Sequence, residues 1–204
     1  MKLTGAAALV TGAGRRLGQA IAVGLARAGC DIAVHYHGSA AGAAATVRDI
    51  RAASKKRRAE LVRADLGNAA AARGLADQAF QSLGRLDIVV NSAAIMVRQP
   101  VETVTPESWD ATMNLNVRAA FFVSQGALPH LRRAKGKIVN LADVAGFEPW
   151  PAYIPHCVSK AGMVMLTKAL ARAVAPDVSA VRFLLENDFV TGTILVVDGG
   201  RLIR

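Results

Sequence analysis

Short apolar runs alternate with longer segments whose apolar residues recur at helical spacing, and this alternation constrains the fold more than any other feature of the chain. Strands that alternate with helices of this length form βαβ units around a parallel sheet. Because the runs are apolar throughout, we expect one α/β domain, residues 1–204, with a doubly wound parallel sheet and helices on both faces. The runs cover residues 6–10, 31–36, 60–64, 86–90, 136–141 and 194–197. The helical segments cover residues 17–28, 40–53, 68–83, 106–131, 153–175 and 180–186.

Composition excludes several other classes of protein. Of the 204 residues, 52% are hydrophobic and 20% are charged, which excludes a disordered chain and a coiled coil. No apolar run approaches the roughly 18 residues of a membrane span, so we expect no membrane partner. Cys30 and Cys157 form neither a disulfide framework nor a zinc motif, so we expect no metal. This cysteine usage fits a reducing compartment, and we expect a cytoplasmic protein.

The net charge of +10 favours anionic partners. The densest basic run, residues 55–58, follows a predicted helix, where cations complement the helix dipole. A nucleic-acid surface is the alternative interpretation, but no aromatic residues alternate with these charges. We therefore interpret the run as a solvated helix end and do not expect a nucleic-acid partner.

The segment after the first apolar run is typical of a phosphate-binding turn. It contains Gly12, Gly14, Arg15 and Arg16, and a predicted helix follows at once. Glycines between a strand and a helix let the backbone approach a diphosphate, which also meets the free N–H groups of the helix. The two arginines add positive charge at the same place. We expect a dinucleotide-binding turn of a Rossmann-like fold, with an ordinary βα turn as the alternative.

The ends of the second and third runs indicate which dinucleotide is bound. An acidic residue after the second strand would hydrogen-bond a ribose 2′-hydroxyl, but the chain has His35, His37 and Ser39 there. These side chains and the nearby Arg15 suit a 2′-phosphate, which favours NADP(H) over NAD(H). Alternatively, the histidines are packing or surface residues. Asp65, after the third run, is either an acceptor for an adenine amino group or a turn residue.

These motifs resemble those of the short-chain dehydrogenase/reductase superfamily, and within it those of the pteridine reductases. Thr11, Gly12, Arg16 and Gly18 match a form of the TGxxxGxG turn in which arginine replaces the middle glycine. Residues 35–41 are similar to the NADPH 2′-phosphate loop, although Gly38 stands where an arginine is usual. The resemblance covers residues 3–178 and resumes over 179–201. It implies that the following residues bind NADP(H): Gly12, Gly14, Arg15, Arg16, Leu17, Gly18, His35, Tyr36, His37, Ser39, Asp65, Leu66, Asn91, Ala93 and Lys160.

The resemblance also implies a set of catalytic residues. Lys160 and Asn116 match the lysine and the helix asparagine of the family tetrad, and Asp143 matches the aspartate of the pteridine reductases. Four residues before the lysine, the family has a proton-donating tyrosine, but this chain has His156. Tyr153 lies seven residues before the lysine, nearly two helical turns away, so we do not expect it to take that role.

Two interpretations of His156 remain open. Imidazolium can donate a proton near neutral pH, and Asp143 would favour the charged ring while Lys160 would oppose it. Alternatively, the histidine is a loss-of-function change, and the protein binds NADP(H) as a sensor or partner protein with little turnover.

Two further departures from the family concern the substrate. The sixth strand and the mobile lid of the family have no counterpart after the helix that ends near residue 175. Met96 stands where pteridine reductases stack a pterin on phenylalanine, and we expect Arg16, Met96 and Asp143 to face the substrate. The expected activity is hydride transfer from NADPH to a carbonyl or a pteridine C=N bond of a small molecule. Because the superfamily commonly forms tetramers through its long helices, here residues 106–131 and 153–175, we expect a homotetramer.

Overall fold

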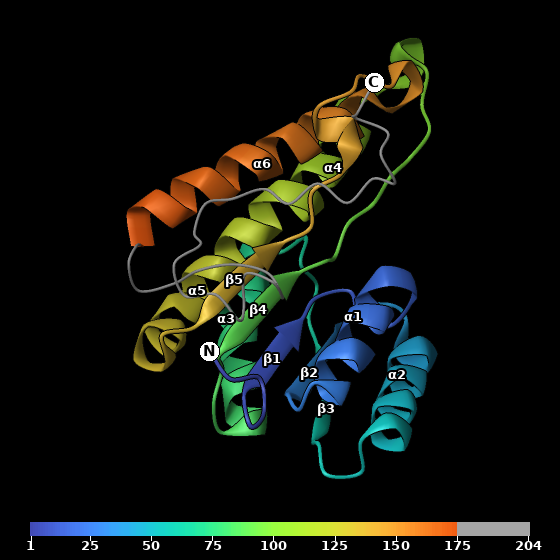
Figure 1. Cartoon of the computed structure of the whole chain (residues 1–204). Coiled ribbons are helices and arrows are strands. Elements are labelled where there is room, and N and C mark those ends of the chain that lie inside the picture. Colours follow the sequence, from blue (N-terminus) through green and yellow to red (C-terminus); the bar gives the residue numbers. More distant parts are fainter. Residues whose placement is uncertain (175–204) are drawn as a thin grey trace, which may run out of the picture.

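The structure, a computed structural model, describes residues 1–174 and contains a parallel five-stranded sheet (Figure 1). The strands lie in the order β3-β2-β1-β4-β5, and each neighbouring pair is parallel. The chain therefore runs outward from the central β1 to one edge and returns to the centre for β4. This order confirms the predicted doubly wound α/β sheet. The strands are β1 Ala7–Val10, β2 Asp31–Tyr36, β3 Ala59–Arg63, β4 Ile88–Asn91 and β5 Lys137–Asn140.

Helices cover both faces of the sheet. Side chains of α1 and α2 pack with Ala8 and Val10 of β1 in one core, and side chains of α3 and α5 pack with Ala7 and Leu9 in the other. Because successive side chains of a strand point to opposite faces, a strand between two cores is apolar at every position. The helices are α1 Arg16–Arg27, α2 Ala40–Ala53, α3 Ala69–Leu83, α4 Pro106–Met113, α5 Ala119–Ala134 and α6 Ile154–Val174.

Local sequence signals set several helix ends. The Oδ1 atom of Asn68 accepts hydrogen bonds from the first N–H groups of α3, and Gly84 ends this helix with a φ of 77°. Thr105 and Ser108 form a capping box before α4, and Pro106 is the first residue of the helix. The helix start predicted at Thr105 is confirmed.

The helical segment predicted over residues 106–131 is confirmed, but it contains a π-helical turn and ends at Ala134. After α4 the chain forms a π-helical turn, Asn114–Arg118, and α5 then continues to Ala134. The π turn changes which side chains face the rest of the molecule, and it buries Asn116 to 1% exposure. Apolar spacing alone does not reveal this turn, because the segment remains helical on both sides of it.

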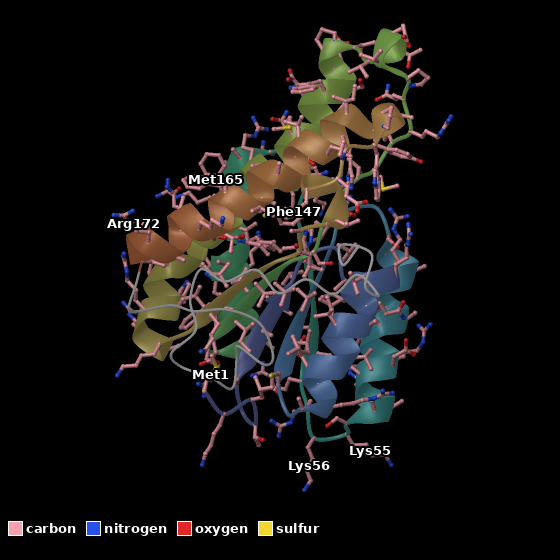
Figure 2. All side chains as sticks on the ribbon, turned by 45° about the horizontal axis from the view of Figure 1, so that its top comes forward. Met1, Lys55, Lys56, Phe147, Met165 and Arg172 are labelled. Atoms are coloured by element: carbon pink, nitrogen blue, oxygen red, sulfur yellow. The ribbon has the colours of Figure 1, made fainter. Side chains whose placement is uncertain are left out.

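The basic run is only partly the solvated helix end predicted for it. Lys55 and Lys56 are exposed beyond the end of α2 (Figure 2). Arg57, however, donates a hydrogen bond to the carbonyl O of Gly29 at 3.0 Å, and Arg58 donates to that of Leu83 at 3.1 Å. These bonds connect the loop before β3 to the ends of α1 and α3, so the second half of the run supports the fold.

Other expectations concern absences or later residues. Within residues 1–174 no helix is long and apolar enough to cross a membrane, and no three potential metal ligands gather. Both cysteines are free, as expected. The helix predicted over 180–186, the strand predicted over 194–197 and the segment expected to be missing near residue 178 lie outside the described residues.

The close packing of α3 against α5 predicts opposite effects for two glycine substitutions. A Cβ at Gly126 would overlap the carbonyl O of Arg73, whereas a Cβ at Gly74 would meet nothing within 4 Å. We expect Gly126→Ala to lower the free energy of unfolding by about 1–3 kcal/mol, because the helices must separate. Gly74→Ala, the matched control within α3, should raise it by up to about 1 kcal/mol through helix propensity. Urea denaturation measures both, and equal effects would contradict this packing.

Candidate active site

The turn after β1 lies directly against the segment after β4. The Oγ1 atom of Thr11 accepts hydrogen bonds from the N–H groups of Ser92 at 2.9 Å and Ala93 at 3.0 Å. Gly12 has a φ of 64°, and a Cβ at this position would lie 2.9 Å from the Cα atom of Ala93. Glycine is therefore required here both by conformation and by space. Sequence reasoning missed the role of Thr11, although a hydroxyl at the end of a strand is a signal for it.

The start of α1 presents positive charge and free N–H groups at this edge of the sheet. Arg15, Arg16 and Leu17 are exposed, and the first N–H groups of the helix have no acceptor within the helix. Gly14 lets this turn approach the start of α2, since a Cβ there would lie 3.1 Å from the carbonyl O of Ser39. The arrangement is suited to binding an anion such as a diphosphate.

His35 lies beneath the turn rather than at its surface. Its side chain is 2% exposed, its Nδ1 atom accepts a hydrogen bond from Gly12 N at 3.0 Å, and its Nε2 atom lies 3.2 Å from Ala64 O. Burial lowers the pKa of His35 to about 4, against a smaller opposite effect of the Ala64 carbonyl. This corrects the expectation that His35 is one of the side chains offered to a 2′-phosphate, because the ring is buried and neutral.

The other residues predicted to bind the cofactor after β2 and β3 differ in exposure. His37 and Asp65 are exposed, with 3.7 Å between Nδ1 and Oδ1, and Ser39 is half-buried before α2. Asp65 also accepts a hydrogen bond from Gly67 N at 2.9 Å, as a turn residue does. Leu66 is 3% exposed and belongs to the core with α3 and α5, so its side chain lies beneath the surface of the site.

Two buried asparagines fix the end of β4 and the segment that follows it. Asn91 donates hydrogen bonds from Nδ2 to Oδ1 of Asn140 at 2.8 Å and to the hydroxyl of Ser124 at 3.1 Å. Asn116, in the π turn, accepts from Ile95 N and donates to Ile95 O, both at 2.9 Å. Its Nδ2 also donates to the hydroxyl of Ser159 on α6.

The structure brings Asp143, His156 and Lys160 together at the carboxyl end of the sheet. The Nε2 atom of His156 lies 3.4 Å from Oδ2 of Asp143, and its Nδ1 atom lies 3.3 Å from Ile95 O. Lys160 donates from Nζ to the carbonyl O of Leu141 at 2.7 Å. Both side chains of α6 are buried, at 3% and 6% exposure. The predicted juxtaposition of these three residues is present.

The imidazole ring of His156 lies between two oxygen acceptors and beside an indole ring. Both ring nitrogens face oxygen acceptors, a carbonyl and a carboxylate, and only imidazolium can donate from both nitrogens. The ring of Trp150 lies nearly parallel to the imidazole, with 6.5 Å between ring centroids. Burial lowers the pKa of Lys160 below its usual value, although Asp143 acts in the opposite direction. The cluster therefore offers an imidazole ring beside a carboxylate as a candidate proton donor or acceptor.

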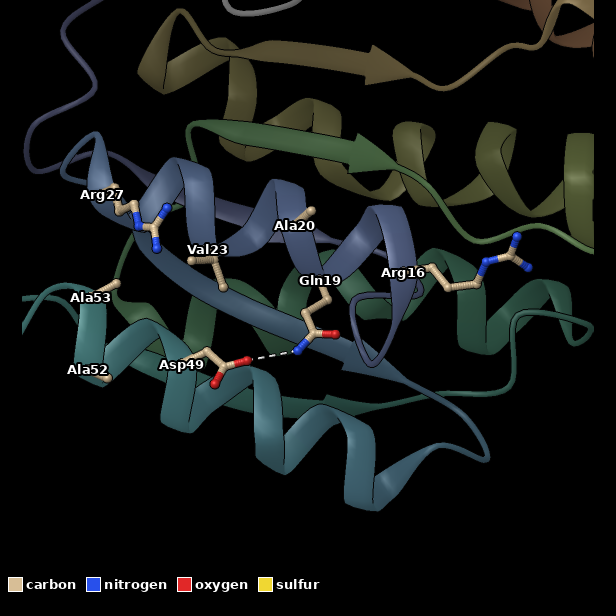
Figure 3. Close-up of a pocket in the computed structure, with 8 residues that line it drawn as sticks. All are labelled: Arg16, Gln19, Ala20, Val23, Arg27, Asp49, Ala52 and Ala53. Atoms are coloured by element: carbon tan, nitrogen blue, oxygen red, sulfur yellow. Dashed lines mark hydrogen bonds between the residues drawn. The ribbon is translucent and has the colours of Figure 1, made fainter.

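Met96, which was expected to face the substrate, and Phe147 are exposed and do not line the groove between α1 and α2. Met96, next to the Ile95 carbonyl, is 51% exposed, and Phe147, after Asp143, is 50% exposed. A groove of about 620 Å³ lies instead between α1 and α2, where Gln19 donates a hydrogen bond to Asp49 (Figure 3). Arg16 was predicted for the cofactor site and also lines this groove. Its side chain points away from Gln19 in Figure 3. We therefore do not assign this groove to the active site. It is lined by Arg16, Gln19, Ala20, Val23, Arg27, Asp49, Ala52 and Ala53.

Known proteins match this chain over most of its length. A family model described as short chain dehydrogenase matches residues 6–184. The protein named "Probable galactose dehydrogenase GalD" of Rhizobium meliloti (strain 1021) is 36% identical over 90% of this chain and 71% of its own length. The hydroxynaphthalene reductase-like protein Arp2 of Metarhizium majus (strain ARSEF 297) is 39% identical over 83% of this chain. This chain spans 62% of that relative, less than two thirds of its length.

A solved structure agrees with the fold. The crystal structure of landomycin C-6 ketoreductase LanV with bound NADP and rabelomycin has a TM-score of 0.81 and 33% identity to this chain. The match covers 88% of this chain and 75% of that one.

The buried, neutral His35 predicts a pH-dependent stability. Because the pKa of His35 is about 4 in the folded chain and 6.5 for an ordinary histidine, as in the unfolded chain, the unfolded chain binds more protons between these pH values. The contribution of the neutral ring is present above pH 6.5 and is lost as the pH falls toward 4. Between pH 7 and pH 4.5, we expect the unfolding free energy to fall by about 2 kcal/mol more in the wild type than in His35→Gln. Urea denaturation at both pH values measures this, and equal losses would contradict the burial of a neutral ring.

Proposed function

This chain belongs to the short-chain dehydrogenase family, and from that premise we propose that it is an NADPH-dependent oxidoreductase that reduces a carbonyl group to an alcohol. The observation that carries the proposal is the meeting of a diphosphate-type turn with the Asp143–His156–Lys160 cluster at one edge of the sheet. In open parallel sheets this edge is where ligands bind.

The charges around the turn favour NADP(H). Arg15 and Arg16 are exposed beside the first N–H groups of α1, and His37 and Ser39 follow β2, where no acidic residue stands. A 2′-phosphate adds negative charge that these groups can bind. The LanV structure holds NADP, which supports the same cofactor here. Asn91, Ala93 and Lys160 are proposed to hold the nicotinamide half, with Gly12, Gly14, Leu17 and Gly18 in the turn and Tyr36, Asp65 and Leu66 near the adenosine.

The cluster supplies the proton that the reduction requires. Bound NADPH would supply the hydride for the carbonyl carbon. The carbonyl oxygen then takes a proton from Nε2 of His156, so that the C=O double bond becomes an alcohol and the ring becomes neutral. Asp143 and the Ile95 carbonyl hold the imidazolium ring in place, and Lys160, one helical turn from His156, adds positive charge near the developing oxyanion.

Carbonyl reduction is favoured over pteridine reduction. The relatives are named for dehydrogenase, hydroxynaphthalene reductase-like and ketoreductase proteins. Asp143 retains the pteridine-reductase pattern, but Met96 replaces the aromatic ring against which a pterin would stack. We therefore propose ketones as the first substrates to test and dihydropteridines as the second.

A second candidate function is an NADP-binding protein with little turnover. The observation that favours it is the histidine at the position of the family tyrosine. Activity of the His156 variants, described below, distinguishes this candidate from the enzyme.

We propose a homotetramer formed through the long helices. Phe121 on α5 and Val158 and Met165 on α6 are exposed apolar side chains, with Met165 at 62% exposure. Large exposed apolar side chains on neighbouring helices are typical of surfaces that other subunits cover.

Charge at the turn should control NADPH affinity. We expect Arg15→Glu combined with Arg16→Glu to raise the dissociation constant for NADPH by at least about tenfold, because the phosphates lose two cations and meet two carboxylates. Arg27→Glu, at the opposite end of α1, is the matched control and should change it by less than about twofold. Fluorescence titration with NADPH measures the dissociation constant of the wild type, the double variant and the control. The proposed cofactor is wrong if the wild type fails to bind NADPH at millimolar concentration.

Substitutions at His156 should change kcat if its side chain is the proton donor. We expect His156→Phe to lower kcat for ketone reduction by about a hundredfold or more while the dissociation constant for NADPH stays within about threefold. Tyr153→Phe, the control, should retain kcat. His156→Tyr decides between the candidates: unchanged or lower turnover supports the histidine acid, whereas a severalfold increase supports the impaired protein. The loss of NADPH absorbance measures the rate of ketone reduction by each variant.

A further inference from the structure

His35 contacts two segments of the proposed cofactor site, the turn proposed to bind the diphosphate and the segment proposed to lie near the adenosine. Its Nδ1 atom accepts from Gly12 N in the turn after β1, and its own carbonyl O accepts from the next N–H of that turn, Ala13 N, at 2.9 Å. Its Nε2 atom reaches Ala64 O, the residue before Asp65. One side chain of β2 therefore lies between the diphosphate turn and the segment that follows β3.

These contacts define one tautomer of the ring. Gly12 N is a donor, so Nδ1 must carry a lone pair, and Ala64 O is an acceptor, so Nε2 must carry the proton. A ring with one donor and one acceptor is neutral, which agrees with its burial. Leucine could fill a similar space but would leave a buried N–H and a buried C=O without a partner.

The bonds to His35 also decide which N–H groups of the turn remain available. The N–H groups of Gly12 and Ala13 both donate to His35 in β2. The following N–H groups, at Gly14 and the first turn of the helix, are the ones left to meet a diphosphate.

We propose that His35 is a positioning residue for NADPH. As the neutral Nε2–H tautomer, it fixes the turn after β1 against the segment after β3, and it does not touch the cofactor itself. The inference rests on the proposed function, since the turn must bind NADPH. It differs from an ordinary packing role, because a packing residue would affect stability without a selective effect on cofactor affinity.

Two variants of His35 test the proposal. His35→Leu should raise the dissociation constant for NADPH, and the KM for NADPH, by at least about tenfold, because the turn loses its fixed geometry. Its kcat at saturating NADPH should fall by less than about threefold, since the His156 cluster is untouched. His35→Gln can offer an amide oxygen to Gly12 N and an amide N–H to Ala64 O, and should restore affinity to within about threefold of the wild type.

A partly buried histidine elsewhere, at 12% side-chain exposure, separates an effect on NADPH affinity from an effect on stability. His130 on α5 pairs with Asp77 at 2.7 Å and stacks on Phe80, far along the chain from the turn. His130→Leu should lower the melting temperature but leave the dissociation constant for NADPH within about twofold. If His35→Leu is folded and binds NADPH as the wild type does, or if His130→Leu weakens NADPH binding equally, the proposal is wrong.

If His35→Leu does not fold, a measurement on the wild-type protein tests the proposal instead. Nitrogen-15 NMR of the imidazole rings at pH 6.5 should show His35 protonated at Nε2 and unprotonated at Nδ1, both with and without NADPH. Protonation at Nδ1 would overturn the proposal. Failure of the wild type to bind NADPH would instead overturn the proposed function, so the two failures are distinguishable.

Discussion

The contact between two backbone segments, the turn after β1 and the segment after β4, is the constraint on which the candidate site depends. A side chain at Gly12 would collide with Ala93, and the Thr11 hydroxyl accepts hydrogen bonds from the facing segment. Because parallel strands end at the same edge of the sheet, this contact brings the anion-binding turn close to the segment that carries Ile95. The proposed cofactor turn and the proposed proton donor therefore lie beside segments that this contact holds together.

The position of His156 is set by three elements rather than by α6 alone. Asn116 in the π turn binds both backbone groups of Ile95, and the carbonyl of Ile95 in turn faces the imidazole ring. A buried polar group without a partner costs about 1–3 kcal/mol, so each of these bonds favours one arrangement of the others. The contacts of His156 are long, at 3.3 and 3.4 Å.

The sequence was sufficient where the signal is local. The strand predicted over residues 31–36 and the helix over 40–53 have the same bounds in the structure, because apolar periodicity follows directly from which faces are covered. The grouping of Asp143, His156 and Lys160 was implied by the resemblance to the reductase family. The π turn at Asn116 was not predicted, since a change of one residue in helical repeat leaves little trace in an apolar pattern. The roles of Arg57 and Arg58 were missed because their acceptors are backbone carbonyls of other elements.

By itself, the sequence determined the order of strands and helices, the glycine–arginine turn and the residues that meet at the carboxyl edge of the sheet. Only the tertiary structure decided what His35 does: its partners Gly12 and Ala64 lie 23 and 29 residues away, and pairing of β2 with β1 and β3 brings them to its two ring nitrogens. The physical reason is that periodicity reports which side of an element is apolar. The partner and protonation state of a buried polar group depend on chain segments that only folding brings together.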